Sequence, residues 1–185
     1  PMYRVNVDGL THVMDAALVH GIKRFVLTST IAAIGRNPSG VSTEEDVFNF
    51  PEKAGEYIRC RVEAERRFFS YVRDKGLPGV AMNVANTYGP GDHTLTPHGR
   101  ILAATAFGEL PFILNAGLPC VGIEDAADAM VLAEHRGRIG ERYIVSDRWL
   151  TQKELYQTAA DHAGTTTRLR VMPLPVLYAL GFCAD

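Results

Sequence analysis

The start of the chain has a helical pattern of apolar residues. Six of them fall on one face of a helix with 3.6 residues per turn: Val7, Leu10, Val13, Met14, Ala17 and Leu18. Gly21 follows, where a glycine commonly ends a helix. The next run, RFVLTST at residues 24–30, is rich in β-branched and aromatic residues, as is typical of a buried parallel strand. The pattern therefore predicts a helix followed by a strand.

Helical and extended patterns alternate along the rest of the chain. Helices are predicted over residues 56–75, 100–107, 124–135 and 151–164, the last with Thr151 and Glu154 spaced as a capping box. The remaining segments are predicted as strands (79–85 and 141–146), short extended pieces (110–114 and 118–123) and turn-rich loops (35–55 and 86–99). This order predicts an α/β fold in which helices cover a parallel sheet.

Three hydroxyl-bearing residues, Thr28, Ser29 and Thr30, end the first predicted strand. In open parallel sheets the ligand crevice lies outside the carboxyl ends of the strands. A buried hydroxyl group must find a hydrogen-bond partner. These side chains therefore either cap a turn or face a polar ligand atom.

Tyr57 and Arg61 are spaced four residues apart at the start of the helix predicted over 56–75. Residues at this spacing share a helical face and can approach each other. A permanent cation close to a tyrosine favours the tyrosinate form, which suits proton transfer. Taken alone, the pair is better explained as an aromatic residue and a cation on a solvated helix face, because a tyrosine and an arginine at this spacing are common.

Composition narrows the classes of protein and partner. The chain has 185 residues, 46% of them hydrophobic, and a formal net charge of -2. We therefore expect a globular protein with no basic patch for nucleic acid and no membrane partner. Three widely spaced cysteines, Cys60, Cys120 and Cys183, predict a cytoplasmic protein with neither a disulfide framework nor a zinc site. The histidines have no metal-ligand spacing, and there is no G-x-S-x-G motif of a serine hydrolase.

The two ends of the sequence also carry an expectation. The chain opens within a helical pattern and closes on the apolar run PLPVLYALGFCAD, whose packing partners we do not find in the sequence. We therefore expect it to be part of a longer polypeptide.

Five motifs stand in a fixed order along nearly the whole chain: NVDGLTHVMDAALVHGIKRFVLTSTIAAIG, EYIRCRVEAE, NVANTYGPGD, VGIEDAADAMVLA and GERYIVSD. Together they resemble the extended short-chain dehydrogenase/reductase family, in its dihydroflavonol-reductase-like, 3β-hydroxysteroid-dehydrogenase-like and hopanoid-associated sugar epimerase-like branches. The resemblance implies a Rossmann-type parallel sheet covered by helices, with a small C-terminal substrate-binding region. It implies that residues 1–90 are the C-terminal part of a dinucleotide-binding domain and residues 91–185 the substrate-binding region, intertwined with the last strands of the sheet.

The resemblance also assigns roles to the residues of the catalytic group. Tyr57 falls on the tyrosine that exchanges a proton with the substrate oxygen, and Thr30 on the residue that hydrogen-bonds the same oxygen. Arg61 falls on the lysine that assists the tyrosine and holds the nicotinamide ribose, and Asn6 on a helix asparagine near the active site.

Further roles follow for the strand ends. The resemblance implies that Thr28, Val84 and Ala85 bind the cofactor, NAD or NADP, together with Tyr57 and Arg61. It implies that Asn86 and Thr87, with Thr30, bind a small-molecule substrate.

Three features depart from the family pattern. The glycine-rich turn that seats the pyrophosphate is absent, so the N-terminal part of the fold is expected to be missing from this sequence. Arg61 replaces lysine, and it keeps the charge but cannot release a proton near neutral pH. Asn83 and Val84 stand where the family usually has arginine and proline.

The resemblance implies an NAD(P)-dependent oxidoreductase acting on a hydroxyl/ketone pair, with tyrosine as general acid and base. Two alternatives remain open: a nucleotide-sugar epimerase or dehydratase of the same family, and a dinucleotide-binding sensor protein without catalysis. A third alternative is an interaction module. The family commonly pairs helices of two subunits, so a homodimer could form through the helix face with Phe68, Phe69, Tyr71 and Val72, unless that face packs on the sheet.

Overall fold

The computed structural model describes residues 2–110, 112–166 and 168–173. The chain divides into two compact units, and each consists of two separate segments. Unit 1 is Pro1–Ala85 with Glu124–Ser146, and unit 2 is Asn86–Ile123 with Asp147–Asp185. The assignment of residues 1–90 to dinucleotide binding and of 91–185 to substrate binding stays a prediction.

A parallel sheet forms the centre of unit 1. Its strands lie in the order β1 (Phe25–Thr30), β2 (Gly79–Val84) and β6 (Arg142–Val145), and both pairings are parallel. The prediction of a Rossmann-type parallel sheet covered by helices is therefore confirmed. At the carboxyl ends of these strands, Thr30 is paired with Val84.

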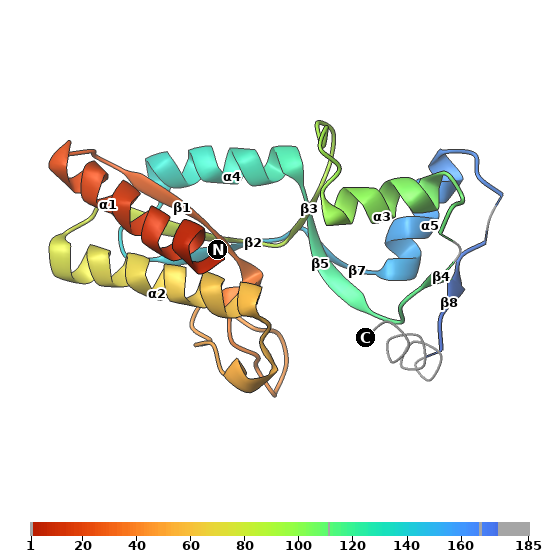
Figure 1. Ribbon diagram of the computed structural model, residues 1–185, viewed down its shortest axis with the longest axis horizontal. Helices are drawn as coiled ribbons and strands as arrows, with labels where there is room; N and C mark the ends of the chain where they lie inside the picture. The colour runs from red at the N-terminus through yellow and green to blue at the C-terminus, as the bar shows by residue number, and fades with distance from the viewer. Residues whose placement is uncertain (1, 111, 167, 174–185) are drawn as a thin grey trace. The chain divides into compact units, whose positions relative to one another are not determined.

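Helices cover both faces of this sheet. Figure 1 shows α1 (Gly9–Val19) and α2 (Glu56–Lys75) on one side of it and α4 (Ile123–Arg136) on the other. A π-helical turn, Arg4–Asp8, runs directly into α1, and α2 ends at Gly76, which has the left-handed conformation (φ +70°) that glycine adopts without strain.

The main core of unit 1 lies between α1, α2 and the sheet. Phe68 is completely buried there, and its ring lies 5.9 Å from that of Phe25. Tyr71 belongs to the same buried cluster, while Phe69 and Val72 pack against it. This face of α2 therefore packs within unit 1, with Phe68 and Tyr71 buried and Phe69 and Val72 partly buried. Dimerisation stays a prediction.

The described residues of unit 2 form short strands and two helices. Strand β5 (Gly117–Gly122) pairs parallel with β3 (Asn86–Tyr88) and antiparallel with β7 (Arg148–Thr151). The other elements are a parallel strand pair and two helices: β4 (Phe112–Ile113), β8 (Arg170–Val171), α3 (Pro97–Ala106) and α5 (Gln152–His162). Ile113, Tyr156 and Leu169 form a small buried cluster.

The helix starts in unit 2 depend on side-chain caps. The predicted capping box is confirmed, because the Thr151 hydroxyl accepts from the Glu154 N–H (3.1 Å) and a Glu154 carboxylate oxygen accepts from the Thr151 N–H (2.8 Å). Helix α3 begins at Pro97, three residues before the predicted start, because the Thr96 side chain accepts from the Gly99 N–H. Strands β3, β7 and β8 were not predicted.

Residues 174–185, which include Cys183 and most of the apolar C-terminal run, lie outside the described residues. In the part of the chain that is described, no helix has the length and apolar character needed to cross a membrane.

Candidate active site

The carboxyl end of β1 alternates between exposed and buried hydroxyl groups. Thr28 is exposed, Ser29 is buried and Thr30 is half-buried. The Thr30 hydroxyl accepts a hydrogen bond from the Ala32 N–H (3.2 Å) and so caps the short 3-10 turn Ile31–Ala33. This single bond leaves the O–H of Thr30 able to donate to another group.

Tyr57 lies in the first turn of α2. Gly55, in an extended conformation, precedes the helix, and Glu56 places a negative charge at its N-terminus, which suits the helix dipole. The Tyr57 side chain is 51% exposed. Because α2 contacts the 3-10 turn that Thr30 caps, the two predicted catalytic side chains belong to elements that touch.

Arg61 lies one turn further along α2, and its guanidinium group joins three elements. Nη2 donates to the Thr28 carbonyl oxygen (2.5 Å), and Nη1 donates to Asn6 Oδ1 (3.4 Å). The Asn6 amide in turn donates to the Met2 carbonyl oxygen (3.0 Å). The structure therefore brings Asn6, Thr28 and Arg61, three of the predicted site residues, into contact.

Asn6 lies in the π-helical turn Arg4–Asp8. Such turns insert one extra residue into a helix and occur frequently at functional sites. The turn had no sequence signal that we could identify, although Asn6 itself was predicted from the resemblance.

Val84 and Ala85 are the remaining residues predicted to bind the cofactor. Val84 pairs with Thr30 across the sheet, and both Val84 and Ala85 are buried. The Ala85 N–H donates to the Val145 carbonyl oxygen (2.9 Å), which continues the sheet beyond the end of β2. The structure thus gathers Thr28, Thr30 and Val84 at the carboxyl edge of the sheet.

A buried polar cluster beside this edge escaped the sequence analysis. Glu65 of α2 is 5% exposed and accepts from Ser29, from Asn83 and from Arg142. The signal that could have revealed it is the pattern itself. Asn83 interrupts the apolar strand GVAMNVA, and Glu65 stands on the apolar face of its helix, beside Ala64 and Phe68.

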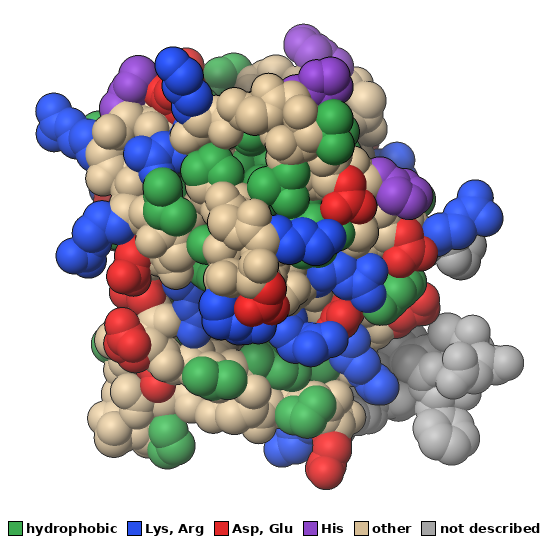
Figure 2. Space-filling model, turned by 90° about the vertical axis from the view of Figure 1, so that its left-hand side faces the viewer, with side chains coloured by type: hydrophobic (Ala, Val, Ile, Leu, Met, Phe, Trp, Pro, Cys, Tyr) green, Lys and Arg blue, Asp and Glu red, His purple; other side chains and the backbone are tan. Residues whose placement is uncertain are grey.

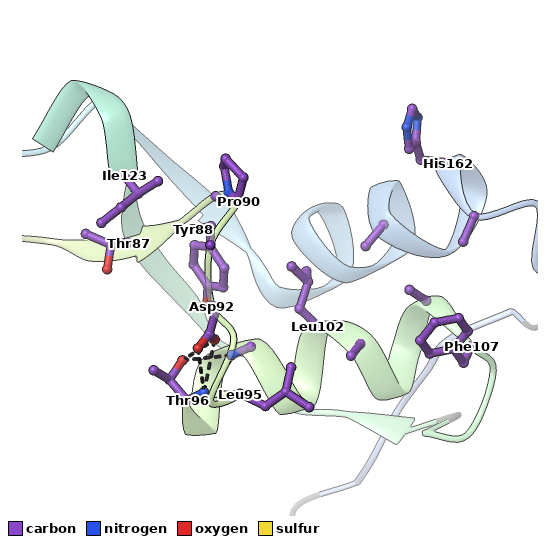
Figure 3. A pocket seen from close by; sticks show the side chains of 17 residues that line it. Thr87, Tyr88, Pro90, Asp92, Leu95, Thr96, Leu102, Phe107, Ile123 and His162 are labelled. Atoms are coloured by element: carbon purple, nitrogen blue, oxygen red, sulfur yellow. Dashed lines mark hydrogen bonds between the residues drawn. The ribbon is translucent and has the colours of Figure 1, made fainter. Parts of the chain in front are cut away.

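The other two predicted site residues, Asn86 and Thr87, belong to unit 2. The Asn86 amide donates to the Pro119 carbonyl oxygen (3.0 Å), so it joins β3 to the neighbouring strand. Thr87 lines a pocket of about 660 Å³ within unit 2 (Figure 3). Pockets of this size are usual for small-molecule ligands.

Residues 87–96 form one part of the pocket wall, and apolar side chains of α3 and α5 form another. Leu102 and Phe107 come from α3 and the residue after it, and Ala159 and Ala163 from α5 and its end. Tyr88 adds a polar group, and its burial raises its pKa well above the ordinary value, with the neighbouring Tyr156 hydroxyl adding to the shift. The pocket therefore suits a mainly apolar molecule with few polar atoms.

Asp92 lines this pocket and holds the loop that precedes α3. Both of its carboxylate oxygens accept from the Thr96 N–H (3.0 Å each), and one also accepts from the Thr96 hydroxyl (2.8 Å), as Figure 3 shows. The backbone N–H of Thr96 and then its hydroxyl lower the pKa of Asp92. Asp92 thus serves as a loop clamp.

Two further observations bear on ligands and partners. Among the described residues, no group of three or more His, Cys, Asp or Glu side chains is placed to hold a metal ion. On the face drawn in Figure 2, Lys, Arg, Asp and Glu side chains are all present among the described residues.

A family model described as "NAD dependent epimerase/dehydratase family" matches residues 1–146. Sterol demethylase protein B of Methylococcus capsulatus is 29% identical over 185 residues, which cover 100% of this chain and 56% of the relative. The 3beta-hydroxysteroid-dehydrogenase/decarboxylase isoform 2 of Arabidopsis thaliana is 29% identical over 136 residues, or 71% of this chain and 24% of the relative.

This chain is also similar to a solved structure. The crystal structure of gox2253 matches with a TM-score of 0.89 and 29% identity, over 98% of this chain and 56% of that one. The chain therefore spans about half the length of sterol demethylase protein B and of gox2253, and a smaller share of the Arabidopsis relative.

Proposed function

Because the chain belongs to the NAD dependent epimerase/dehydratase family, we propose that the complete protein is an NAD(P)-dependent oxidoreductase acting on a hydroxyl/ketone pair. The observation that carries the proposal is the Arg61 guanidinium. It is held by Thr28 at the carboxyl end of β1 and by Asn6, one helical turn from the exposed Tyr57.

Tyr57 exchanges the proton in the proposed reaction. Its hydroxyl donates a proton to the substrate oxygen when a ketone is reduced, and the tyrosinate accepts that proton when an alcohol is oxidised. The Thr30 hydroxyl donates a hydrogen bond to the same oxygen. When bound, the nicotinamide supplies or accepts the hydride that balances this proton.

Arg61 has donors to spare for a ribose. A guanidinium group carries five N–H donors. The bonds to Thr28 and Asn6 use one on each terminal nitrogen, and Nε–H is buried. One N–H remains on each terminal nitrogen, and together with the Tyr57 hydroxyl these fit the hydroxyl groups of a nicotinamide ribose.

The arginine also constrains the path of the proton. A lysine can pass a proton onward, whereas an arginine side chain does not release its proton near neutral pH. Tyr57 therefore has to exchange its proton with water through its own exposed hydroxyl. We propose that Arg61 takes no part in the proton transfer itself and instead holds the nicotinamide ribose.

The substrate proposed for this reaction is largely apolar. The pocket of unit 2 supports this choice, because its wall consists mainly of aliphatic side chains and Phe107. The names of two relatives, a sterol demethylase protein and a 3beta-hydroxysteroid dehydrogenase/decarboxylase, also support a hydroxyl group on an apolar skeleton.

The proposal is tested by net turnover of the cofactor. The complete protein is incubated with NAD(H) or NADP(H) and a panel of apolar alcohols and ketones, and the absorbance of the reduced nicotinamide is followed. We expect one mole of cofactor to be converted for each mole of substrate. In a parallel assay with sugar nucleotides, a change of configuration without net conversion of the cofactor would instead establish the epimerase alternative.

The sensor alternative is tested with Arg61→Lys in the same assay. If both forms bind the cofactor and neither converts any member of the panel, the oxidoreductase proposal is wrong and a non-catalytic dinucleotide-binding protein is the better account. If the wild type converts substrate, the sensor alternative is excluded.

A further inference from the structure

A charged pair lies inside unit 1, and its residues are not among those assigned to the reaction above. Arg142 Nη1 of β6 donates to Glu65 Oε1 (3.0 Å), and the side chains are 16% and 6% exposed. The other carboxylate oxygen of Glu65 accepts from the Ser29 hydroxyl and from the Asn83 amide (2.6 Å). Three donors from three different strands therefore surround one helical carboxylate.

Stability alone does not account for such a pair. Removing two charges from water costs several kcal/mol, and apolar residues of the same volume often serve at least as well. The cluster even leaves Asn83 Oδ1 buried without a hydrogen-bond partner among the described residues, which has a further cost. What directed charged bonds do provide is a single fixed arrangement of the elements that they join.

The elements joined are those that carry the proposed catalytic groups. Ser29 stands between Thr28, which holds Arg61, and Thr30. The Asn83 amide donates both to Glu65 and to the Thr30 carbonyl oxygen (3.0 Å). Glu65 itself lies one helical turn beyond Arg61 and two beyond Tyr57. Bonds to Glu65 therefore fix the end of β1 relative to α2.

Arg142 extends the same anchor to the loop that leads into α2. Its Nε donates to the Glu44 carbonyl oxygen (2.7 Å) and its Nη2 to the Asp46 carbonyl oxygen (3.1 Å). The Asp46 carbonyl oxygen also accepts a hydrogen bond from the Gly35 N–H (2.8 Å). The two backbone segments approach so closely that a β-carbon at residue 35 would clash with the Val47 carbonyl oxygen. One guanidinium group thus binds a helix carboxylate and two loop carbonyls.

We propose that the Glu65–Arg142 pair is a positioning device for the reaction. It holds the end of β1, helix α2 and the loop at residues 44–46 in one arrangement. In this arrangement the hydroxyl groups of Thr30 and Tyr57 can both reach the same substrate oxygen. The inference rests on the proposed function, and Glu65 and Arg142 are positioning residues that act through Thr30 and Tyr57.

The first test separates positioning from a general loss of structure. In the complete protein, Arg142→Met removes all three bonds, and Arg142→Lys keeps a cation for Glu65 but cannot span the two carbonyls. We expect Arg142→Met to lower kcat by up to about 100-fold, the cost of a misplacement of about 1 Å, with a much smaller change in KM. Arg142→Lys should recover part of the loss, and Glu63→Gln, at a surface ion pair of the same helix, should keep the wild-type kcat.

The second test asks whether the pair acts through Thr30. Thr30→Ala is measured in the wild-type background and in the Arg142→Lys and Arg142→Met backgrounds. If the pair positions Thr30, the loss caused by Thr30→Ala shrinks in both backgrounds, because the hydroxyl is already misplaced. Equal losses in all folded backgrounds, or a wild-type kcat for Arg142→Met, would overturn the inference.

A third measurement does not depend on turnover. Hydrogen exchange of the backbone amides at residues 31–35 and 44–47 should be faster in Arg142→Lys than in Glu63→Gln. Unchanged exchange at both segments would overturn the anchoring. Wild-type turnover by Tyr57→Phe would instead overturn the proposed function, whatever the exchange shows, so the two failures can be told apart.

Discussion

In unit 1 a charged pair, Glu65 and Arg142, lies inside the core, whereas in unit 2 the carboxylates of Asp92 and Glu154 lie at the surface and bind the backbone of loops and helix ends. Unit 1 buries this pair beside three parallel strands, where Glu65 also accepts from Ser29 and Asn83. Unit 2 contains a pocket with a mainly apolar wall.

This difference indicates that unit 1 positions reacting groups and that unit 2 binds an apolar ligand. Groups that transfer a proton need fixed positions, and a buried network of directed bonds gives them that. An apolar pocket fixes a ligand less strictly, because aliphatic contacts are non-directional. We therefore expect substitutions in unit 1 to change stability and rate constants most, and substitutions in unit 2 to change substrate affinity most.

Core truncation should show the largest difference between the two units. Phe68 is fully buried in unit 1, and Phe68→Ala should cost about 3–5 kcal/mol in the free energy of unfolding. Leu102→Ala, at the half-buried wall of the pocket in unit 2, should cost about 1–2 kcal/mol. Denaturant unfolding of the complete protein measures both, and equal costs would contradict the comparison.

Filling the pocket should affect binding rather than folding. Ala103 of α3 lines the pocket, and Ala103→Phe should raise the KM for an apolar substrate by about 10-fold or more, with a smaller change in kcat. Ile101→Phe, on the same helix but outside the lining, is the matched control. If both variants raise KM equally, the pocket does not bind the substrate.

Loss of a helix cap in unit 2 should have a moderate effect. Thr151→Ala removes the hydroxyl of the capping box and should cost about 1 kcal/mol in the free energy of unfolding. The effect on kcat should be absent, in contrast to Arg142→Met in unit 1. A loss of kcat at unchanged stability would show that α5 takes part in the reaction.

The smallest expected effect is the pH dependence of the surface clamp. The pKa of Asp92 is lowered by the Thr96 N–H and hydroxyl, so the folded state holds its proton less tightly than the unfolded state. The clamp is therefore fully present above the unfolded pKa of about 4 and is lost as the pH falls through the folded pKa. The difference in melting temperature between wild type and Asp92→Asn should vanish in acid, and a constant difference would contradict this assignment.

The sequence predicted the sheet of unit 1 well because its elements are long and regular. Helix α2 has a clear period, Gly76 marks its end, and strand β2 is a mainly apolar run that is buried throughout. Strands β3, β7 and β8 were missed because they have two to four residues and form only by pairing with distant strands. The π-helical turn at Arg4–Asp8 departs from the helical period by one residue and leaves no separate mark in the sequence.

The site was predictable only in part for a similar reason. Resemblance by motif indicated Asn6, Thr28 and Arg61, and the structure brings these together. The Glu65–Arg142 pair joins residues 77 positions apart, and no local pattern connects them. A buried partner of this kind becomes visible only when the strands are placed side by side.

The measurement that tests the account most directly compares two tyrosines of unit 1. Tyr57 and Tyr3 are both about half exposed, at 51% and 45%. In the complete protein we expect Tyr57→Phe to lower kcat/KM by about 100-fold or more, as loss of a general acid does, while Tyr3→Phe keeps the wild-type value. Undiminished turnover by Tyr57→Phe would contradict the proposed proton transfer.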